Sequence, residues 1–138
     1  MIVLDASAAV DLLLQIQPNA GVIGVRLGRV GESLHTPAVF DAEVLQVIRR
    51  YWLRKLLSPS RARLALDDLS DLTITRYPIA PLMGRMWDLR QNLSAFDAAY
   101  IVLAEALDAP LITTDMKLAR TPRHRARVEG YPSEPAGV

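Results

Sequence analysis

Short apolar runs alternate along the chain with longer stretches in which apolar residues recur at helical spacing. Residues 1–4 form an apolar run typical of a strand, and Val10, Leu13 and Leu14 then recur three to four residues apart. The same pattern predicts further strands over 34–36, 73–75 and 111–113. Further helices are expected over 20–30, 37–57, 58–69, 81–91 and 94–107. Strands separated by such helices form right-handed crossovers, so we expect an α/β protein, a three-layer α/β/α fold with a mainly parallel central sheet.

The length of 138 residues fits one domain. We expect residues 1–130 to form it and residues 131–138 to be a frayed C-terminal tail. The longest uninterrupted apolar run, at 98–104, has seven residues, far fewer than the roughly 20 that cross a bilayer. The N-terminal stretch has no basic residue and carries Asp5 and Asp11, which argues against a signal peptide. We therefore expect a cytoplasmic protein without a membrane partner.

The composition excludes several kinds of chemistry and leaves one charge pattern of interest. Cysteine is absent, which excludes disulfides, thiolate zinc sites and cysteine nucleophiles. Only His35 and His124 supply imidazole groups. The net charge is only +1, but fourteen of the sixteen basic residues are arginine, the side chain suited to bidentate phosphate contacts. Segments 49–63 and 117–127 carry bases without any acid, although a solvated helix face explains the first equally well. The candidates for contact with phosphate groups are Arg49, Arg50, Arg54, Lys117 and Arg120.

Three aspartates lie just past a predicted strand or in the first turn of a predicted helix. Asp5 lies where the first strand ends, and Asp115 lies two residues past the strand at 111–113. Ligands of open α/β sheets bind at the carboxyl ends of the strands, so both acids are placed at the expected functional edge. Asp97 follows Ser94 by three residues, the spacing of a capping box, and opens a helix that is apolar nearly all round. Helix capping alone would explain each of these residues taken singly.

A fourth acid, Glu43, lies on the apolar stripe of its predicted helix, four residues from both Val39 and Val47. An ionised carboxylate on such a face needs an arginine, a proton or a metal ion, and a structural pair with an arginine remains open. Asp41, two residues earlier, lies on a different face of the same helix. Asp11 is expected to face solvent. The apolar neighbours therefore favour Glu43 over Asp41 as a functional acid.

Four acids at strand ends or on inward helix faces, with no histidine or cysteine nearby, indicate a cation site that suits Mg²⁺ or Mn²⁺. Four segments also resemble, in order and spacing, the motifs of the PIN domain, and in particular those of the VapC-type ribonuclease toxins of bacterial toxin–antitoxin systems. The resemblance extends from residue 1 to about residue 128. Its four segments are VLDASA at 3–8, PAVFDAEVLQVIRR at 37–50, LSAFDAAYIVLAEAL at 93–107 and PLITTDMKLA at 110–119.

The resemblance implies an activity and a role for individual residues. The residues that match the metal-binding and catalytic acids of the family are Asp5, Glu43, Asp97 and Asp115. Ser7 and Thr113 match hydroxyl positions that often support this site. The implied activity is a Mg²⁺-dependent endoribonuclease that hydrolyses phosphodiester bonds in tRNA or rRNA loops, and so inhibits translation as the toxin of a toxin–antitoxin pair.

The resemblance also implies partners, namely the RNA substrate, a cognate antitoxin and a second copy of the chain in a homodimer. The antitoxin peptide would lie in an apolar groove between helices, and residues 12–14 and the pair Tyr51 and Trp52 offer spare apolar surface. Two other classes of protein remain open. A non-catalytic PIN-fold RNA-binding or interaction module would carry the same acids. A phosphoryl-transfer fold with an aspartyl nucleophile would need a D-x-D pair after the first strand, where Asp5 is instead followed by Ala6 and Ser7.

Overall fold

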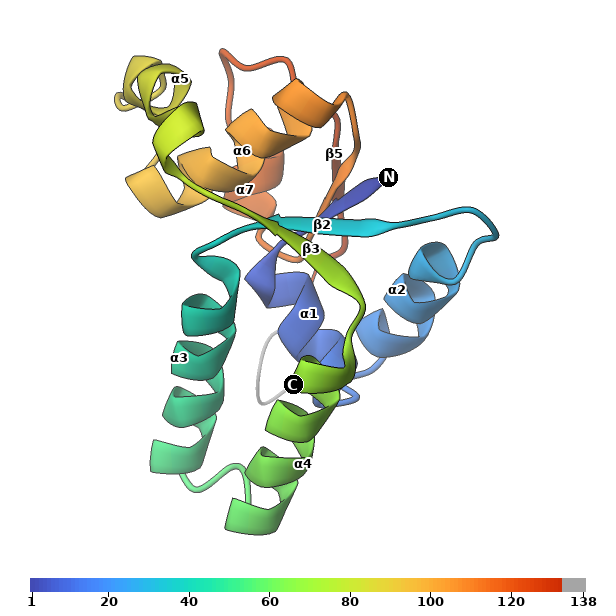
Figure 1. The fold of residues 1–138 in the computed structure, drawn as a ribbon. Coiled ribbons are helices and arrows are strands. Elements are labelled where there is room, and N and C mark those ends of the chain that lie inside the picture. The colour runs from blue at the N-terminus through green and yellow to red at the C-terminus, as the bar shows by residue number, and fades with distance from the viewer. Residues whose placement is uncertain (133–138) are drawn as a thin grey trace.

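The computed structural model describes residues 1–132, which form five strands, seven α-helices and one 3₁₀ turn (Figure 1). The strands are β1 (Ile2–Leu4), β2 (Leu34–Pro37), β3 (Ile74–Tyr77), β4 (Leu111–Thr113) and β5 (Val128–Gly130). The helices are α1 (Ala6–Leu13), α2 (Asn19–Leu27), α3 (Phe40–Leu53), α4 (Pro59–Asp71), α5 (Met83–Asp88), α6 (Ala95–Leu107) and α7 (Met116–Arg120), and the 3₁₀ turn η1 (Ala80–Leu82) precedes α5.

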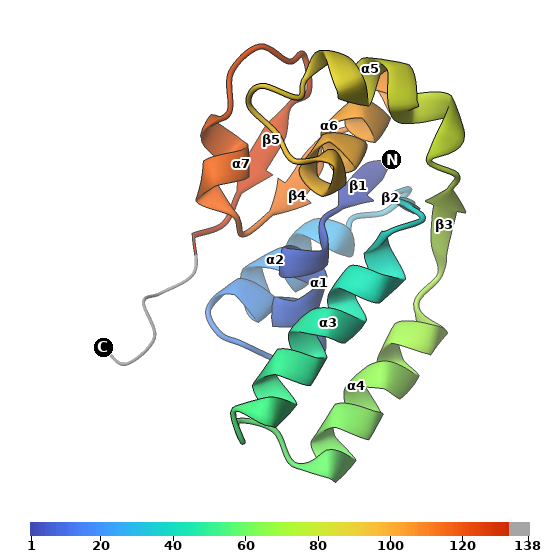
Figure 2. The ribbon, with the colours of Figure 1, turned by 90° about the vertical axis from the view of Figure 1, so that its left-hand side faces the viewer.

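All five strands run parallel, in the order β3-β2-β1-β4-β5. Helices α1 to α4 lie on one side of the sheet and α5 to α7 on the other (Figures 1 and 2). The predicted three-layer α/β/α fold is therefore confirmed. The chain builds outward from β1 in one direction through β2 and β3, and then in the other through β4 and β5. This reversal makes the carboxyl ends of β1 and β4 the point where an α/β sheet opens a crevice for a ligand.

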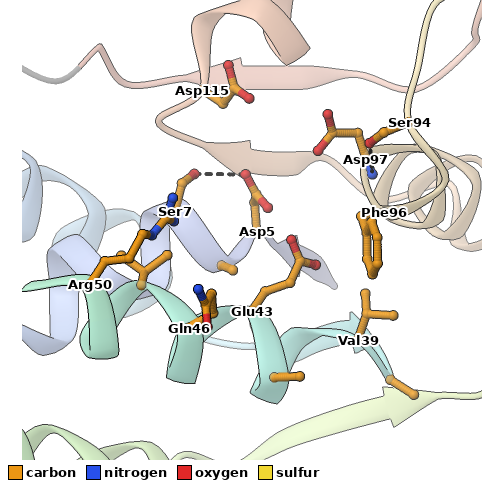
Figure 3. Close-up of a pocket in the computed structure, with 14 residues that line it drawn as sticks. Asp5, Ser7, Val39, Glu43, Gln46, Arg50, Ser94, Phe96, Asp97 and Asp115 are labelled. Atoms are coloured by element: carbon orange, nitrogen blue, oxygen red, sulfur yellow. Dashed lines mark hydrogen bonds between the residues drawn. The ribbon is translucent and has the colours of Figure 1, made fainter. Parts of the chain in front are cut away.

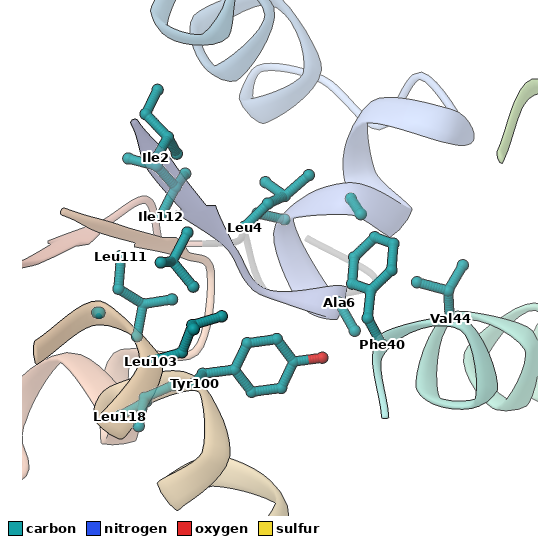
Figure 4. Close-up of a cluster of buried hydrophobic side chains, with 14 of the residues drawn as sticks. Ile2, Leu4, Ala6, Phe40, Val44, Tyr100, Leu103, Leu111, Ile112 and Leu118 are labelled. Carbon is teal, nitrogen blue, oxygen red and sulfur yellow. The ribbon is translucent and has the colours of Figure 1, made fainter. Parts of the chain in front are cut away.

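The core forms around the central strand and the helix that covers it. Every residue of β1 is fully buried, as expected for a parallel strand covered on both faces. All of residues 98–104 of α6 are buried too, which confirms the prediction from its apolar sequence. Tyr100 of α6 and Phe40 of α3 are the largest fully buried side chains, and both lie next to the start of α1 in Figure 4. The core therefore extends up to the segment that follows β1.

Three predicted helices are shorter than expected, and one of them, α2, ends at Leu27 and not at residue 30. Pro37 ends β2, where it pairs with Tyr77 of β3, so α3 begins at Phe40 and not at residue 37. Its C-terminus comes before Lys55, because Lys55 takes a left-handed backbone conformation with φ of 60° that interrupts helical hydrogen bonding. Helix α5 has only six residues, since the 3₁₀ turn takes up its expected first turn.

The sequence pattern did not predict the last two elements, α7 and β5. Strand β5 adds to the edge of the sheet, where Val128 pairs with Leu111 of β4. Tyr131, expected in the tail, instead donates its N–H to the carbonyl of Thr113 at 2.8 Å. Residues 133–138 of the expected tail lie outside the described residues. Within residues 1–132, none of the helices is both long enough and apolar enough to cross a membrane.

The expectation that Asp11 faces solvent is wrong. Only 7% of Asp11 is exposed, and its Oδ2 accepts a hydrogen bond from Asn19 Nδ2 at 2.9 Å. Helix α2 packs against this face of α1, which the periodicity of α1 alone does not show. Asp11 therefore links two helices of the fold.

His35 is a buried structural histidine that ties β2 to β3. Its Nε2 shares a hydrogen bond with Ser33 Oγ at 2.7 Å, and its Nδ1 shares one with Tyr77 Oη, also at 2.7 Å. Burial lowers the pKa of His35, and the positive N-terminal amine of Met1 adds to this effect. Burial and the charge of the amine therefore both favour the neutral imidazole in the folded protein.

We predict that His35 makes the stability of the fold depend on pH. Because its pKa is lower in the folded protein, the stability from the neutral imidazole is present above about pH 6.5 and is lost as the pH falls through the folded-state value. The difference in free energy of unfolding between wild type and His35→Gln, measured with urea, should therefore shrink from about pH 8 to about pH 5. Tyr77→Phe keeps the imidazole and should keep the wild-type pH dependence. A difference that stays constant with pH would contradict this prediction.

Candidate active site

Asp5 lies directly after β1, at the opening between β1 and β4, and only 6% of it is exposed. Its Oδ2 accepts hydrogen bonds from Ser7 Oγ at 2.7 Å and from Thr113 Oγ1 at 2.6 Å. Both hydroxyl residues singled out from the sequence therefore contact this carboxylate. Burial raises the pKa of Asp5, and the two hydroxyl groups oppose that rise. Asp5 is thus held in one orientation by groups from α1 and β4.

Asp97 and Asp115 each take part in a helix cap, as their spacing predicted. The N–H of Asp97 donates to Ser94 Oγ at 3.2 Å, which leaves the Asp97 carboxylate free to point into the cavity (Figure 3). Asp115 Oδ1 accepts from the backbone N–H of Lys117 at 2.9 Å and of Leu118 at 3.4 Å. Burial raises the pKa of Asp97, and the negative charge of Asp115 raises it further. The two carboxylates therefore interact across the gap between α6 and α7.

Glu43 lies on α3, and its Oε1 is buried without a hydrogen-bond partner among the described residues. None of the salt bridges within residues 1–132 involves Glu43, so the alternative of a structural pair with an arginine is wrong. Burial raises the pKa of Glu43; the nearby phenol of Tyr100 opposes the rise, and the charges of Asp5 and Asp97 add to it. One carboxylate oxygen of Glu43 is therefore buried near other acids, and no basic side chain within residues 1–132 forms a salt bridge with it.

All four acids line one open cavity of about 770 Å³ at the carboxyl edge of the sheet. Figure 3 shows them reaching it from different elements: Asp5 from the end of β1, Glu43 from α3, Asp97 from α6 and Asp115 from the start of α7. Thr113 is fully buried beneath the hydrogen bond that it makes to Asp5. The other residues that line the cavity are Ala6, Ser7, Ala38, Val39, Ala42, Gln46, Val47, Arg50, Ser94 and Phe96.

The four carboxylates share this cavity without forming a closed cage. Within residues 1–132, no three histidine or acidic side chains lie close enough together to hold one ion as they stand. Repulsion between the negative groups favours this separation, and their raised pKa values have the same origin in part. A cation would have to draw the carboxylate oxygens inward, which side-chain rotation in an open cavity allows.

Asp41, the alternative to Glu43 on α3, lies outside this cavity. Its two carboxylate oxygens accept from Arg76 Nε at 2.6 Å and from Arg76 Nη2 at 2.8 Å, in an exposed bidentate pair. Of the two acids on α3, Glu43 lines the cavity and Asp41 does not.

The predicted RNA contacts occupy different surfaces. Arg50 lines the acidic cavity. Arg54 lines a smaller depression next to Arg50, and Arg49 lines a groove between α3 and α4. Lys117 and Arg120 are exposed on α7, the helix that Asp115 caps. The structure thus brings one of the five to the acids and leaves the others around them.

The sequence interpretation missed three side chains at or near the site: Phe96, Gln46 and Tyr100. Phe96 is exposed and lines the cavity one residue before Asp97. Gln46 follows Glu43 by one helical turn, so helical spacing from Glu43 gives its position. The hydroxyl of Tyr100 is buried without a hydrogen-bond partner among the described residues and lies near Glu43. Tyr100 follows Asp97 by three residues, so helical spacing from Asp97 gives its position too.

Comparison with known proteins places the chain in a family. The family model of the PIN domain matches residues 2–124. Ribonuclease VapC12 of Mycobacterium tuberculosis is 41% identical over 129 residues, which cover 94% of this chain and 98% of that protein. The chain therefore belongs to the PIN domain family, and within it to the group of the VapC ribonucleases.

Solved structures agree on the fold. VapBC2 from Rickettsia felis, described as bound to a DNA fragment from its promoter, matches with a TM-score of 0.67 and 17% identity, over 94% of this chain and 98% of that one. VapC20 of Mycobacterium tuberculosis, described as a Sarcin-Ricin loop cleaving toxin, matches with a TM-score of 0.67 and 12% identity, over 88% and 100%. At these identities the likeness establishes a common fold.

We predict that the charge of Glu43 destabilises the fold in the absence of metal. Glu43→Gln removes that charge at nearly constant volume, so it should raise the melting temperature in EDTA near neutral pH, or leave it unchanged. The same variant should show a smaller rise in melting temperature on addition of Mg²⁺, because a ligand stabilises only the state that binds it. Thermal melting followed by circular dichroism measures both quantities.

Glu105→Gln is the matched control for this measurement. Glu105 is buried on α6 but pairs with Arg85 at 3.0 Å and accepts from the N–H of Arg125 at 2.7 Å. These contacts lower the pKa of Glu105, so the loss of its charge should destabilise the fold by roughly 1–3 kcal/mol. Equal losses of stability in the two variants would show that Glu43 is structural.

Proposed function

We propose that this protein is a Mg²⁺- or Mn²⁺-dependent endoribonuclease that acts in the cytoplasm as the toxin of a toxin–antitoxin pair. The observation that carries the proposal is the cavity at the ends of β1 and β4, where four acids from separate elements meet without any salt bridge among the described residues. The identity to VapC ribonucleases over most of the chain supports RNA as the substrate.

The donor set fits a hard divalent cation. Carboxylate oxygens are the ligands that Mg²⁺ and Mn²⁺ prefer, and the buried Oε1 of Glu43 has no other partner among the described residues. The residues that would hold the ion are Asp5, Glu43, Asp97 and Asp115. When bound, the ion supplies a water that is nucleophilic near neutral pH and stabilises charge on the phosphate and the leaving oxygen.

The protein's own groups position the ligands and the substrate. Ser7 and Thr113 hold the carboxylate of Asp5 in place and shield its charge with hydrogen bonds. Capping holds Oδ1 of Asp115 at the start of α7, where the residue lines the cavity. Arg50 on the cavity wall attracts the phosphate backbone, since the acids alone would repel it.

We place the substrate among single-stranded loops of tRNA or rRNA, with translation as the process inhibited. Proteins recognise RNA sequence mostly in unpaired loops, because the grooves of A-form helices hide the bases. The fold shared with VapC20, which is described as cleaving the Sarcin-Ricin loop, supports this class of target. Arg54 lines a depression that shares Arg50 with the cavity, and Lys117 and Arg120 are exposed on α7, which Asp115 caps, so these three offer contacts to RNA beyond the cut site. Arg49, in the groove between α3 and α4, offers a contact farther from the acids.

We place the antitoxin in the groove between α3 and α4. The groove has a volume of about 340 Å³, and its walls include the exposed side chains of Leu45 and Trp52. An amphipathic peptide would bury this apolar surface. Likeness to VapBC2 supports a protein partner of this kind. The remaining exposed apolar helix surface is where we place the contact of a homodimer.

The first test of the activity removes one acid from the cavity. Asp97→Asn keeps the volume of the side chain and removes a charge that a cation needs, so cleavage of total RNA should fall by more than about 100-fold with the fold intact. Asp5→Asn should behave in the same way. Asp41→Asn is the control, because it removes a carboxylate of α3 that lies outside the cavity. Cleavage by Asp97→Asn at the wild-type rate would overturn the assignment, and sequencing of the fragments from wild type would identify the RNA.

The second test concerns the metal. Cleavage should need Mg²⁺ or Mn²⁺, stop in EDTA, return when Mg²⁺ is added back, and persist with a chelator that removes zinc but spares magnesium. Mg²⁺ binding should also release protons, which a pH indicator detects without any RNA. Cleavage that survives exhaustive EDTA treatment would exclude the metal mechanism. Proton release and RNA binding without cleavage would instead favour a non-catalytic PIN-fold module.

A further inference from the structure

The cavity that holds the acids has a second, apolar wall. Phe96 lines it with 58% of its surface exposed, although it directly precedes the buried part of α6. Its ring points toward Val39, which lines the cavity from the segment before α3 (Figure 3). Ala38 and Ala42 continue this wall with small side chains. The acids therefore share their cavity with an aromatic ring and a patch of small apolar groups.

The ring of Phe96 is not needed for packing the fold, whereas Val39 also packs against the core. Phe96 does not belong to the buried core of residues 1–132, and it is among the most exposed large apolar side chains there. Helix α6 packs on the sheet through residues 98–104. A polar residue at 96 would therefore serve the fold as well as phenylalanine does. The cavity volume of about 770 Å³ also falls within the usual range for organic ligands, which exceeds what one phosphate group needs.

We propose that Phe96, with Val39 and Ala42, forms a subsite for one unpaired nucleobase of the RNA next to the phosphodiester that is cut. The inference rests on the proposed function. An aromatic face binds any base by stacking, and the apolar wall covers the other side of a flat ring. Arg50 lines the same cavity and contacts the phosphate backbone, so base and backbone are held together. This arrangement selects RNA that can turn a base out of its stack.

Steady-state cleavage tests the subsite on a single-stranded 12-residue RNA of random sequence. Phe96→Ala should raise KM by roughly 5- to 150-fold, the range expected for loss of one base–aromatic stack, with a smaller change in kcat. Phe96→Tyr should restore the wild-type KM, whereas Phe96→Leu should not. Trp87→Ala removes another exposed aromatic ring that lies outside this cavity and should leave KM unchanged. Equal KM values for wild type and Phe96→Ala would overturn the proposal.

A binding measurement separates stacking from a general loss of RNA affinity. Phe96→Trp is made in a background where Trp52→Phe and Trp87→Phe remove the native fluorescence and Asp5→Asn prevents cleavage. The random RNA should quench the fluorescence of the new indole, and a 12-residue abasic chain with the same backbone should quench it much less. Equal quenching by the two chains would show that only the backbone is bound near residue 96, and would overturn the proposal.

The two measurements also distinguish the subsite from the activity on which it rests. If wild type cleaves RNA while Phe96→Ala keeps the wild-type KM, the subsite is wrong and the proposed function stands. If wild type neither cleaves nor binds the random RNA, or cleaves by a metal-independent route, the proposed function is wrong and the subsite falls with it.

Discussion

Burial of the Asp5 carboxylate at the end of β1, a strand that is covered on both faces, is the constraint on which much of the site depends. The fold must supply hydrogen bonds that offset the cost of this burial. Strand β1 is central because the chain extends the sheet on both sides of it. Its neighbour β4 brings Thr113 to Asp5, and α1 brings Ser7 back toward it, at 2.6 and 2.7 Å. These two hydrogen bonds offset part of the cost of burial. The same geometry opens the cavity that the other acids line.

The chain has fourteen arginines, and their salt bridges involve acids outside the cavity. Glu105 and Glu129 pair with Arg85 and Arg26 at 3.0 and 2.9 Å, and their pKa values are lowered. The cavity acids have no such partner among the described residues, and the pKa values of three of them are raised. Arginine 61 also serves the fold, because Arg61 Nη2 donates to the carbonyl of Leu13 at 2.8 Å. Within residues 1–132, the negative charges of the acids are therefore left unpaired in the cavity where a cation and a phosphate would bind.

The two walls of the cavity complement each other chemically. An RNA strand presents a charged backbone and flat apolar bases. An acidic site alone would repel the backbone and would offer no contact to the bases. A cation bound as proposed would, together with Arg50, reverse the sign of the field at the acids, while Phe96 and Val39 present an apolar face within the same cavity. The low net charge of +1 is consistent with attraction that is local to the site and not spread over the molecule.

The sequence by itself determined the fold class, four of the five strands and the four acids, because these depend on local periodicity and on the ends of strands and helices. It also indicated Glu43 over Asp41, since helical spacing alone separates their faces. Only the tertiary structure decided that Glu43 forms no salt bridge with an arginine within residues 1–132, that Asp11 is buried against α2, and that β5 forms one edge of the sheet. Those facts depend on which elements pack together far apart in the sequence. The exposure of Phe96 beside the acids could not be predicted for the same reason. The surroundings of a residue at the start of α6 depend on how α3 and α6 pack around the cavity.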